Sequence, residues 1–377
     1  MISLSWQQVN AWRLAQHCLS ERLQRRDLLL AVKRTGGIQV QVMSAAEIAL
    51  GIRVDGLSPR DVQSALWQDR TLIKTWAMRA ALHLIPASDL PIYVAARSLS
   101  ETLNWPHYFN YYGISQTVLE DYLCIAPEIL GNQPMRREEF AIAVSERLRS
   151  TEIYDLLVTK GWGTPLKPLA WRGDLCFGPN QGQNVTFVNP HKWLNEWQSV
   201  EPYSALQEMV RRYLNAFGPA TPKDFAMWWG NRITPTRTLF KSLEEELEPV
   251  EVEGWQAIAL RTTLEPMQNL KASETVNLLP LFDAYTLGLG RGLEIEPILS
   301  MNFQKLVYRP QGWISAVVLV DGFIKGVWEY TSQRTQTRII VYMFSSPTTE
   351  VKAGIAFEAE RLSKFLNKNI MLEFKLS

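Results

Sequence analysis

The chain contains 377 residues, of which 46% are hydrophobic and 20% charged, a composition typical of globular proteins and too apolar for a disordered one. At roughly 100–150 residues per domain, this length predicts two to four domains. The formal net charge is only +1, so no global field attracts the protein to a polyanion, and a nucleic-acid site depends on locally clustered basic residues.

Cysteine and histidine are few and widely spaced. The three cysteines and four histidines show neither the spacing of a disulfide framework nor that of a metal site. The N-terminus lacks the charged and apolar regions of a signal peptide, and no uncharged apolar run approaches ~18 residues. We therefore expect a soluble, cytoplasmic protein that uses no metal and no cofactor.

The first 92 residues predict helices that alternate with short strands. Residues 5–34 carry the 3.6-residue apolar period of a helix, with Ser5 as the N-cap and basic residues in the second half. A short helix is expected over 45–52, and a Ser-Pro-Arg-Asp sequence at 58–61 has the pattern of a helix N-terminus. Residues 71–85 predict one or two strands.

Between the basic helix and the next one lies a short run in which apolar and polar residues alternate. The run, called here the glutamine segment, is Gly36-Gly37-Ile38-Gln39-Val40-Gln41-Val42-Met43. Strict alternation predicts an extended strand with the aliphatic residues on one face and Gln39 and Gln41 on the other. Two neutral amides side by side hold a water or a sugar in a fixed orientation, but they are neither strong acids nor strong bases. An ordinary solvent-facing strand is the alternative interpretation.

The order of capped helix, second helix and two-stranded ribbon then recurs. One copy has a helix that opens with residues 134–139 and continues to 148. It is followed by strands at 175–177 and 185–188, which flank a loop at 178–184. Another has a Thr-Pro-Lys-Asp cap at 221–224, a helix over 236–246, and strands at 250–252 and 255–260. This order is that of a winged helix-turn-helix, so we predict three such units, at 1–92, 93–198 and 199–266.

From residue 267 to the C-terminus the pattern is rich in strands. We expect strands at 277–282, 305–309, 313–320, 323–330, 337–344 and 370–374, and a helix over 350–367. Asp321-Gly322 is a strong two-residue hairpin signal. The polar loop at 331–336, with Arg334 near its centre, is either the tip that enters a nucleic-acid groove or an ordinary solvated loop. We predict a β-barrel-like domain.

Several of these segments, taken together, resemble the AlkZ/YcaQ-type winged-helix DNA glycosylases. They are Gln39-Val40-Gln41, Thr75-Trp76-Ala77-Met78-Arg79, Leu82-His83-Leu84, Trp171-Arg172-Gly173, Phe217-Gly218-Pro219-Ala220-Thr221, Leu278-Leu279-Pro280-Leu281-Phe282-Asp283, and Gly312-Trp313-Ile314 with Val320-Asp321-Gly322. The resemblance implies an α+β fold of three tandem winged helices and a β-barrel-like domain, wrapped around duplex DNA. Gln41 stands where the YcaQ branch carries an acid, which points to the AlkZ-like branch. Ala80-Ala81 departs from the family pattern beside His83.

The resemblance also implies a reaction and its site. We expect a monomeric DNA repair glycosylase that hydrolyses the N-glycosidic bond of alkylated purines in double-stranded DNA and leaves an abasic site. Such an enzyme would be associated with the nucleoid when bound. Gln39 and Gln41 are the expected catalytic residues. The expected DNA-binding residues are Arg79, His83, Arg172, Gln333, Arg334 and Arg338.

Structural roles compete with some of these assignments. For His83 the role of a hydrogen-bonded structural histidine is favoured over a catalytic one. Trp76 and Trp171 are expected in the core, and Asp283 is expected to cap or brace a turn. Two other functions are also open: a winged-helix DNA-binding regulator without chemistry, and a degenerate relative that serves as an interaction scaffold.

Overall fold

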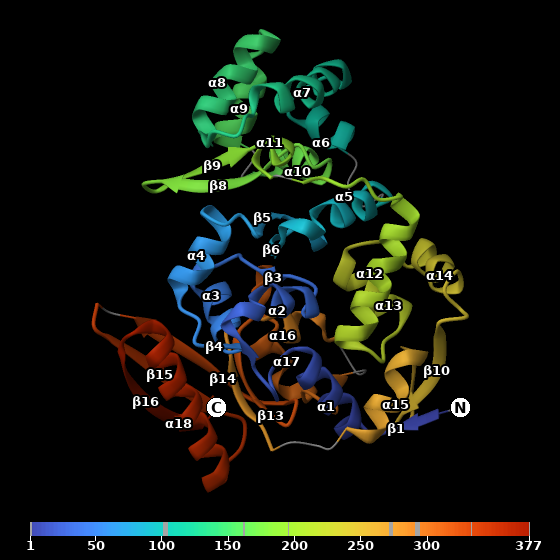
Figure 1. Ribbon diagram of the computed structural model, residues 1–377, viewed down its shortest axis with the longest axis vertical. Coiled ribbons are helices and arrows are strands. Elements are labelled where there is room, and N and C mark those ends of the chain that lie inside the picture. Colours follow the sequence, from blue (N-terminus) through green and yellow to red (C-terminus); the bar gives the residue numbers. More distant parts are fainter. Residues whose placement is uncertain are drawn as a thin grey trace. The chain divides into compact units, whose positions relative to one another are not determined.

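The computed structural model describes residues 2–100, 105–160, 163–194, 196–270, 274–290, 295–332 and 334–376. The chain divides into two compact units. Unit 1 comprises Met1–Val62, Val210–Trp228 and Ile233–Ser377, and unit 2 comprises Gln63–Met209 and Trp229–Arg232. Both units mix helices and sheets (Figure 1), which confirms the expected α+β class.

Unit 1 begins with a helix that is shorter than the sequence predicts. Helix α1 (Trp6–Gln16) starts at the expected cap, where Ser5 Oγ accepts from the Gln8 amide at 3.2 Å and Gln8 Oε1 accepts from the Ser5 amide at 2.9 Å. The single helix expected over 5–34 is wrong. After α1 come β2 (Leu23–Gln24), the 3-10 turn η1 (Arg25–Asp27) and α2 (Leu28–Arg34). Strand β2 pairs with the distant β4 (Val54–Asp55), and this non-local pairing overrides the local helical period.

Two of the predicted helix starts are confirmed by the same cap, in which a Ser or Thr donates twice to an Asp three residues later. At α4 (Pro59–Trp67), the amide and hydroxyl of Ser58 both donate to Asp61 Oδ2 at 2.8 Å. At α13 (Pro222–Trp229), the amide and hydroxyl of Thr221 donate to Asp224 Oδ2 at 2.8 and 2.6 Å. A local sequence pattern is sufficient here because the partners are only three residues apart.

The segment around α13 follows the predicted helix–ribbon order. The elements are α12 (Pro202–Phe217), α14 (Ile233–Lys241), β10 (Leu247–Val252), β11 (Trp255–Leu260) and α15 (Arg261–Asn269). Helix α14 starts three residues before the expected position and ends five residues early. Strands β10 and β11 form the expected hairpin, whose turn at Glu253 and Gly254 has φ of 47° and 92°. The N-terminal β1 (Ile2–Leu4) adds a parallel edge to β10.

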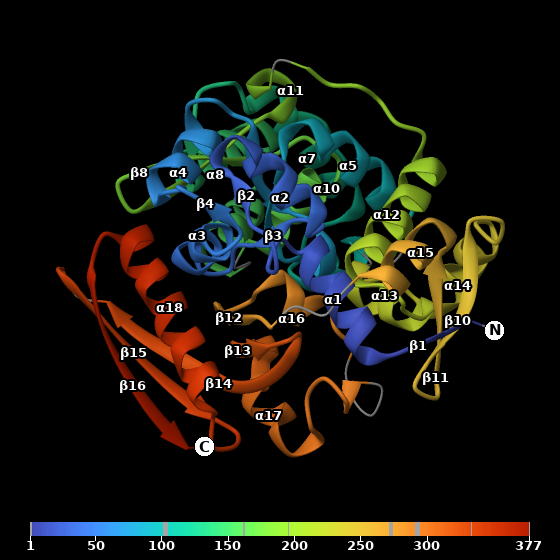
Figure 2. The same cartoon turned by 60° about the horizontal axis from the view of Figure 1, so that its bottom comes forward.

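The C-terminal part of unit 1 is an open five-stranded sheet rather than a closed barrel. Its strands, in spatial order, are β12 (Val276–Leu279), β13 (Ala316–Val320), β14 (Phe323–Ser332), β15 (Gln336–Met343) and β16 (Asn369–Leu376). Helix α18 (Thr349–Leu366) connects β15 to the parallel β16 and packs on the sheet (Figure 2). Asp321 and Gly322 have φ of 52° and 81°, as the predicted two-residue turn requires. The domain is therefore a half-barrel.

One predicted strand of this region is wrong. Most of the 305–309 segment lies in helix α17 (Gln304–Val307), and Tyr308 makes only an isolated bridge to Ile314. The neighbouring short elements are α16 (Ala284–Gly288), η7 (Met301–Phe303) and η8 (Pro310–Gly312). A single bridge is too little pairing to hold the segment in a strand, so the backbone satisfies its hydrogen bonds locally.

A fully buried ion pair joins the first 60 residues of unit 1 to its C-terminal part. Arg53 Nη1 and Nη2 donate to the two oxygens of Asp283, both at 2.7 Å, and both side chains have no exposed surface. Arg53 also donates to the Ala49 carbonyl at the end of α3 (Met43–Gly51). Asp283 Oδ1 in addition accepts from the Tyr285 amide at 2.9 Å and so caps α16, as expected. The pair therefore fixes the end of α3.

Unit 2 consists of two hairpins and a group of helices. Its first elements are β5 (Leu72–Trp76), η2 (Met78–Ala80), β6 (Leu82–Pro86), η3 (Ala87–Asp89), α5 (Leu90–Ser98), α6 (Trp105–Tyr111) and α7 (Gln116–Ile129). They are followed by β7 (Met135–Arg136), α8 (Arg137–Leu148), α9 (Thr151–Asp155), η4 (Leu156–Lys160), η5 (Thr164–Leu166), α10 (Lys167–Trp171), β8 (Cys176–Gln181), β9 (Asn184–Val188) and α11 (Pro190–Trp193). The core contains Trp76 and Trp171, as expected.

The second ribbon of unit 2 is longer than the sequence predicts. The expected loop at 178–184 is wrong, because β8 continues to Gln181 and β9 begins at Asn184. Gly182, with φ of 63°, lies in the tight turn between them.

Among the described residues of both units, no helix combines the length and the apolar character that crossing a lipid bilayer requires.

The buried ion pair predicts a large effect of Asp283→Asn. The variant keeps the side-chain shape but leaves Arg53 as an uncompensated buried charge, so we expect unit 1 to lose about 3–5 kcal/mol of stability in urea unfolding. Glu373→Gln is the control, because its pair with Arg338 is exposed and should leave stability unchanged. A loss below about 1 kcal/mol for Asp283→Asn would contradict the assigned role.

Candidate active site

The glutamine segment connects two helices through a sharp reversal of the chain. Helix α2 ends at Arg34, and Gly36 and Gly37 follow with φ of 68° and 97°, a conformation that L side chains rarely adopt. Their amides donate to the Lys33 and Val32 carbonyls at 3.1 and 2.9 Å, which closes the end of α2. Strand β3 (Ile38–Gln39) starts directly afterwards.

Gly36 is required for a second reason. A Cβ atom at this position would lie 2.8 Å from Cζ2 of Trp228, a side chain that is itself buried. Trp228 packs with Tyr213 and Phe217 of α12, at ring-centroid distances of 5.1 and 6.0 Å. The turn before the glutamines therefore lies directly on a rigid aromatic cluster.

The expected alternating strand ends after Gln39 and does not continue through Gln41, and the two glutamines differ in burial. Gln39 is only 9% exposed, like the buried Ile38 and Val40, whereas Gln41 is exposed. Strand β3 contains only two residues, and the chain bends at Gln41 and Val42 to enter α3 at Met43. Most of the segment is nevertheless non-helical, so the two amides lie close in sequence, one inside the protein and one at its surface.

Helix α3 presents an N-terminus without a side-chain cap directly after Gln41. Its N-cap residue is Val42, whose side chain cannot accept a hydrogen bond from the first-turn amides. Such a terminus carries partial positive charge and suits a phosphate group. Ser44, in the first turn, is exposed, and its hydroxyl lies 3.2 Å from Tyr330 Oη of β14.

Arg79 of unit 2 lies in a strained turn between β5 and β6. Arg79 and Ala80 have φ of 53° and 54°, uncommon for residues with a side chain. A Cβ at Gly230 would approach the Arg79 backbone to within 2.9 Å, so only glycine fits at position 230. The turn thus holds Arg79 in one backbone conformation.

His83 lies on β6 and is only 1% exposed. Its Nδ1–H donates to the Ala81 carbonyl at 2.9 Å. Burial, with a smaller contribution from the Arg79 charge, lowers the pKa of His83 from 6.5 to about 3, so the imidazole is neutral at physiological pH. These surroundings are those of a structural histidine, and its expected contact with DNA stays a prediction.

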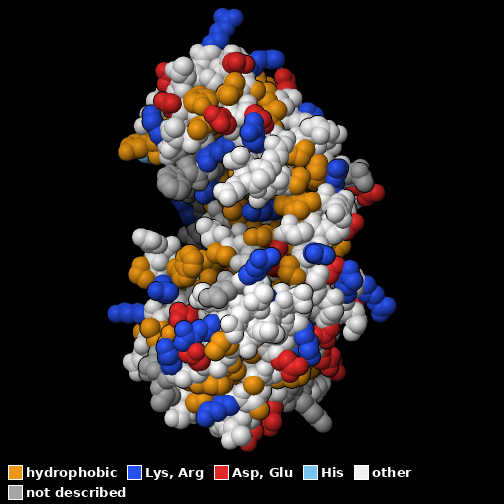
Figure 3. All heavy atoms as spheres, turned by 90° about the vertical axis from the view of Figure 1, so that its left-hand side faces the viewer, with side chains coloured by type: hydrophobic (Ala, Val, Ile, Leu, Met, Phe, Trp, Pro, Cys, Tyr) orange, Lys and Arg blue, Asp and Glu red, His pale blue; other side chains and the backbone are white. Residues whose placement is uncertain are grey.

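The other expected DNA-binding residues differ in their surroundings. Arg172 pairs with Asp174 at 2.9 Å, and Arg338 donates twice to Glu373, at 2.8 and 2.7 Å. Arg334 is exposed beyond the end of β14, and Gln333 lies outside the described residues. Lys and Arg side chains are interspersed with Asp and Glu on the face that carries α18, β15 and β16 (Figure 3).

Comparisons with known proteins match nearly the whole chain. Residues 32–365 match the family model described as DNA glycosylase AlkZ-like. The chain belongs to the AlkZ-like DNA glycosylase family. It is 34% identical over 345 residues to an interstrand DNA cross-link repair glycosylase of Streptomyces sahachiroi, covering 87% of this chain and 89% of the relative. The solved structure of the Streptomyces sahachiroi DNA glycosylase AlkZ superimposes with a TM-score of 0.87 at 31% identity, over 100% of both chains.

Membership in the AlkZ-like family confirms the resemblance and the expected enzyme class. The protein is a DNA repair glycosylase, a hydrolase that acts on N-glycosyl bonds. The roles of individual residues are a separate question, because they depend on the site and not on the fold.

Sequence reasoning missed one residue that shapes the Arg79 turn in unit 2 of this AlkZ-like protein. Arg97 of α5 is 4% exposed, and its Nη2 donates to the carbonyls of Ala77 and Trp229 at 3.2 and 2.7 Å. Its guanidinium also lies over the rings of Trp171 and Trp229, at 4.8 and 4.3 Å. Arg97 thereby anchors the backbone just before the Arg79 turn. A single arginine on an apolar helix carries no sequence signal for this role.

The neutral His83 predicts a pH dependence of stability. Because its pKa is about 3 in the folded state and near 6.5 unfolded, the unfolded chain binds the proton first. The neutral imidazole makes its full contribution to the free energy of unfolding above pH 6.5, and this contribution is lost as the pH falls towards 3. Between pH 6 and 4, His83→Gln should therefore lose stability less steeply than the parent, by about 1.4 kcal/mol per pH unit.

Urea unfolding of unit 2 at several pH values measures this difference in slope. The control is His107→Gln, because His107 is exposed. Parallel pH profiles for the parent and His83→Gln would show that folding does not lower the pKa of His83.

Proposed function

We propose that the protein excises purines alkylated at N7 or N3, including bulky adducts and crosslinks, and leaves an abasic site. The name of the Streptomyces relative, an interstrand DNA cross-link repair glycosylase, supports a substrate of this kind. The observation that carries the proposal is that a buried Gln39 and an exposed Gln41 lie two residues apart where the chain bends.

The chemistry of these lesions suits a neutral pair. A purine alkylated at N7 or N3 is already cationic, so the base leaves as a neutral molecule and no general acid is needed. The difficult parts are to stabilise the positive charge that develops on the sugar and to deliver water to C1′. Neutral amides do both without protonating an undamaged base, so normal DNA is spared.

The burial of the two side chains suggests a division of roles. Gln41, at the surface, is the side chain that reaches the DNA, and its carbonyl oxygen lies against the sugar as positive charge develops. Gln39, inside the protein, has a fixed orientation and positions the attacking water. Neither residue is a lysine, so the enzyme forms no Schiff base and is monofunctional.

We also propose how the rest of the chain meets DNA. The three helix–helix–ribbon segments, at 1–92, 93–198 and 199–266, act as tandem winged helices and the half-barrel at 267–377 completes the DNA-binding surface. The uncapped N-terminus of α3 receives a phosphate next to the scissile nucleotide. Arg79 and Arg334 contact the phosphate backbone. Arg172 and Arg338 also do so, by exchanging their carboxylate partners for a phosphate. The protein acts as a monomer.

The function is tested with duplex DNA that carries one N7-methylguanine. We expect the full-length protein to generate abasic sites, which hot alkali converts to strand breaks, while alkali-free samples stay intact because the enzyme has no lyase step. An unmodified duplex is the matched control. Binding of the duplex without any excision would instead favour a non-catalytic DNA-binding protein.

Arg334→Ala tests the expected DNA contact of the connection between β14 and β15, which is shorter than the predicted loop at 331–336 because both strands extend into it. Loss of one phosphate contact should weaken duplex binding and make the slope of log affinity against log salt shallower by about one. Stability should stay within ~0.5 kcal/mol because the side chain is exposed. Lys352→Ala, which removes the same charge from an exposed site on α18, should leave binding unchanged. Equal binding by the two variants would refute the contact.

A further inference from the structure

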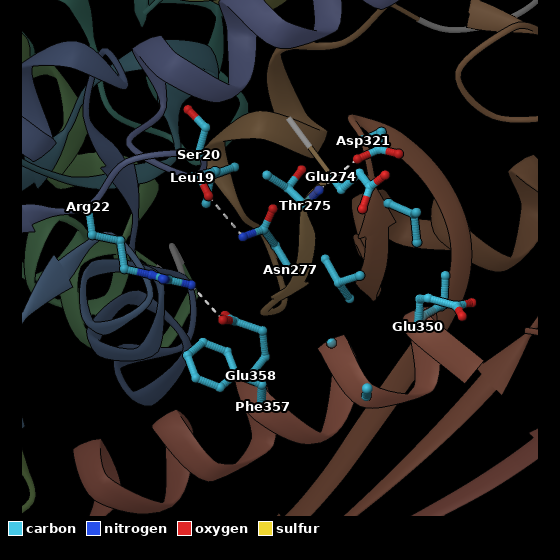
Figure 4. A pocket seen from close by; sticks show the side chains of 15 residues that line it. Leu19, Ser20, Arg22, Glu274, Thr275, Asn277, Asp321, Glu350, Phe357 and Glu358 are labelled. Carbon is cyan, nitrogen blue, oxygen red and sulfur yellow. Dashed lines mark hydrogen bonds and ion pairs between the residues drawn. The ribbon is translucent and has the colours of Figure 1, made fainter. Parts of the chain in front are cut away.

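Unit 1 contains a cavity of about 690 Å³ that the proposed reaction does not use. It lies between the first half of α18, strand β12, the Asp321 turn and the loop at 19–22 (Figure 4). Its volume is within the range typical of sites for small organic ligands. We call it the α18 cavity.

Two buried side-chain oxygen atoms on its wall, both able to accept, have no hydrogen-bond partner within the described ranges. Asn277 is 1% exposed, and its Nδ2 donates to the Leu19 carbonyl at 3.1 Å, but its Oδ1 has no partner among the described residues. Figure 4 shows this oxygen turned towards the gap between Ser20 and Thr275, both of which line the cavity. The Oγ1 atom of Thr275 is also buried and has no partner in the described part of the chain. Unpaired buried acceptors are costly, so they indicate a missing donor.

The charge around these acceptors is negative. Among the described residues, four carboxylates line the α18 cavity, those of Glu274, Asp321, Glu350 and Glu358, against one cation, Arg22. Arg22 is itself paired with the buried Glu358. Such a lining repels DNA phosphates and other anions, so the cavity is not an extension of the DNA-binding surface.

Apart from Ser20, the rest of the described lining is apolar. Val276 and Val351 contribute aliphatic surface, and Phe357 at the edge is 58% exposed although it is large and hydrophobic. The cavity therefore offers both hydrophobic contact and hydrogen-bond acceptors. Its ideal ligand carries donors without acceptors, and an ammonium group has three donors and no acceptor.

We propose that the α18 cavity binds a small organic cation, an ammonium group attached to an apolar body. The ammonium group donates to Asn277 Oδ1 and Thr275 Oγ1 within the field of the carboxylates. The apolar body packs against Val276, Val351 and Phe357.

The test uses the full-length, DNA-free protein and three matched probes in calorimetric titrations. Phenethylammonium has the proposed chemistry, 2-phenylethanol replaces its charge by a hydroxyl, and 3-phenylpropionate carries a negative charge. We expect phenethylammonium to bind at least about 10-fold more tightly than the alcohol, as a charge-assisted hydrogen bond provides, and the carboxylate not to bind. Equal binding of the three probes, or no saturable binding of phenethylammonium, overturns the proposal, because water alone would then satisfy the acceptors.

A pair of α18 variants locates the binding site. Ala353 lines the cavity and is exposed, so Ala353→Phe should fill its edge without disturbing the fold and weaken phenethylammonium binding at least about 10-fold. Ala356 is equally exposed on α18 but does not line the cavity, and Ala356→Phe should bind like the parent. Unchanged binding by Ala353→Phe would place the ligand elsewhere and overturn the proposal. Excision of N7-methylguanine should be the same in both variants.

Discussion

The close contact between Gly36 and Trp228 is the constraint on which the candidate active site depends. Because a side chain at position 36 would collide with the indole, the chain passes directly over the aromatic cluster of α12 and α13. The left-handed conformation of Gly36 and Gly37 then turns the chain from α2 into β3 within two residues. This tight reversal places Gln39 inside the protein and Gln41 at its surface.

Contacts around α3 fix the other end of the segment. The helix is held at its C-terminal end by the buried pair of Arg53 and Asp283, and its first turn is joined to β14 by Ser44 and Tyr330. A site held from both sides loses little orientational freedom when it meets a substrate, and such preorganisation is what electrostatic stabilisation of a transition state requires. The C-terminal half-barrel therefore supports the site through Asp283 as well as through any contact that it makes with DNA.

The sequence predicts features that depend on neighbours a few residues apart. The caps at Ser58 and Thr221 and the turn at Asp321 are correct because each is closed by local hydrogen bonds or by positive φ at a glycine. The helix across 5–34 is wrong because β2 pairs with a strand 31 residues away (Leu23 with Val54). The burial of Gln39 could not be predicted either. Alternation of polar and apolar residues assigns side chains to strand faces only when the strand is longer than two residues. The pair itself was identified through the family resemblance and not through its geometry.

The central claim is that Gln39 and Gln41 act together on one transition state. It is tested most directly by single-turnover excision of N7-methylguanine from duplex DNA by Gln39→Ala, Gln41→Ala and the double variant. Each single change should slow excision on the order of 10- to 1000-fold at unchanged duplex affinity, and the double variant should lose less than the product of the two. Gln41→Asp should keep appreciable activity, because its carboxylate also stabilises a positive sugar. Excision at the parental rate by the two single variants and the double variant would contradict the claim.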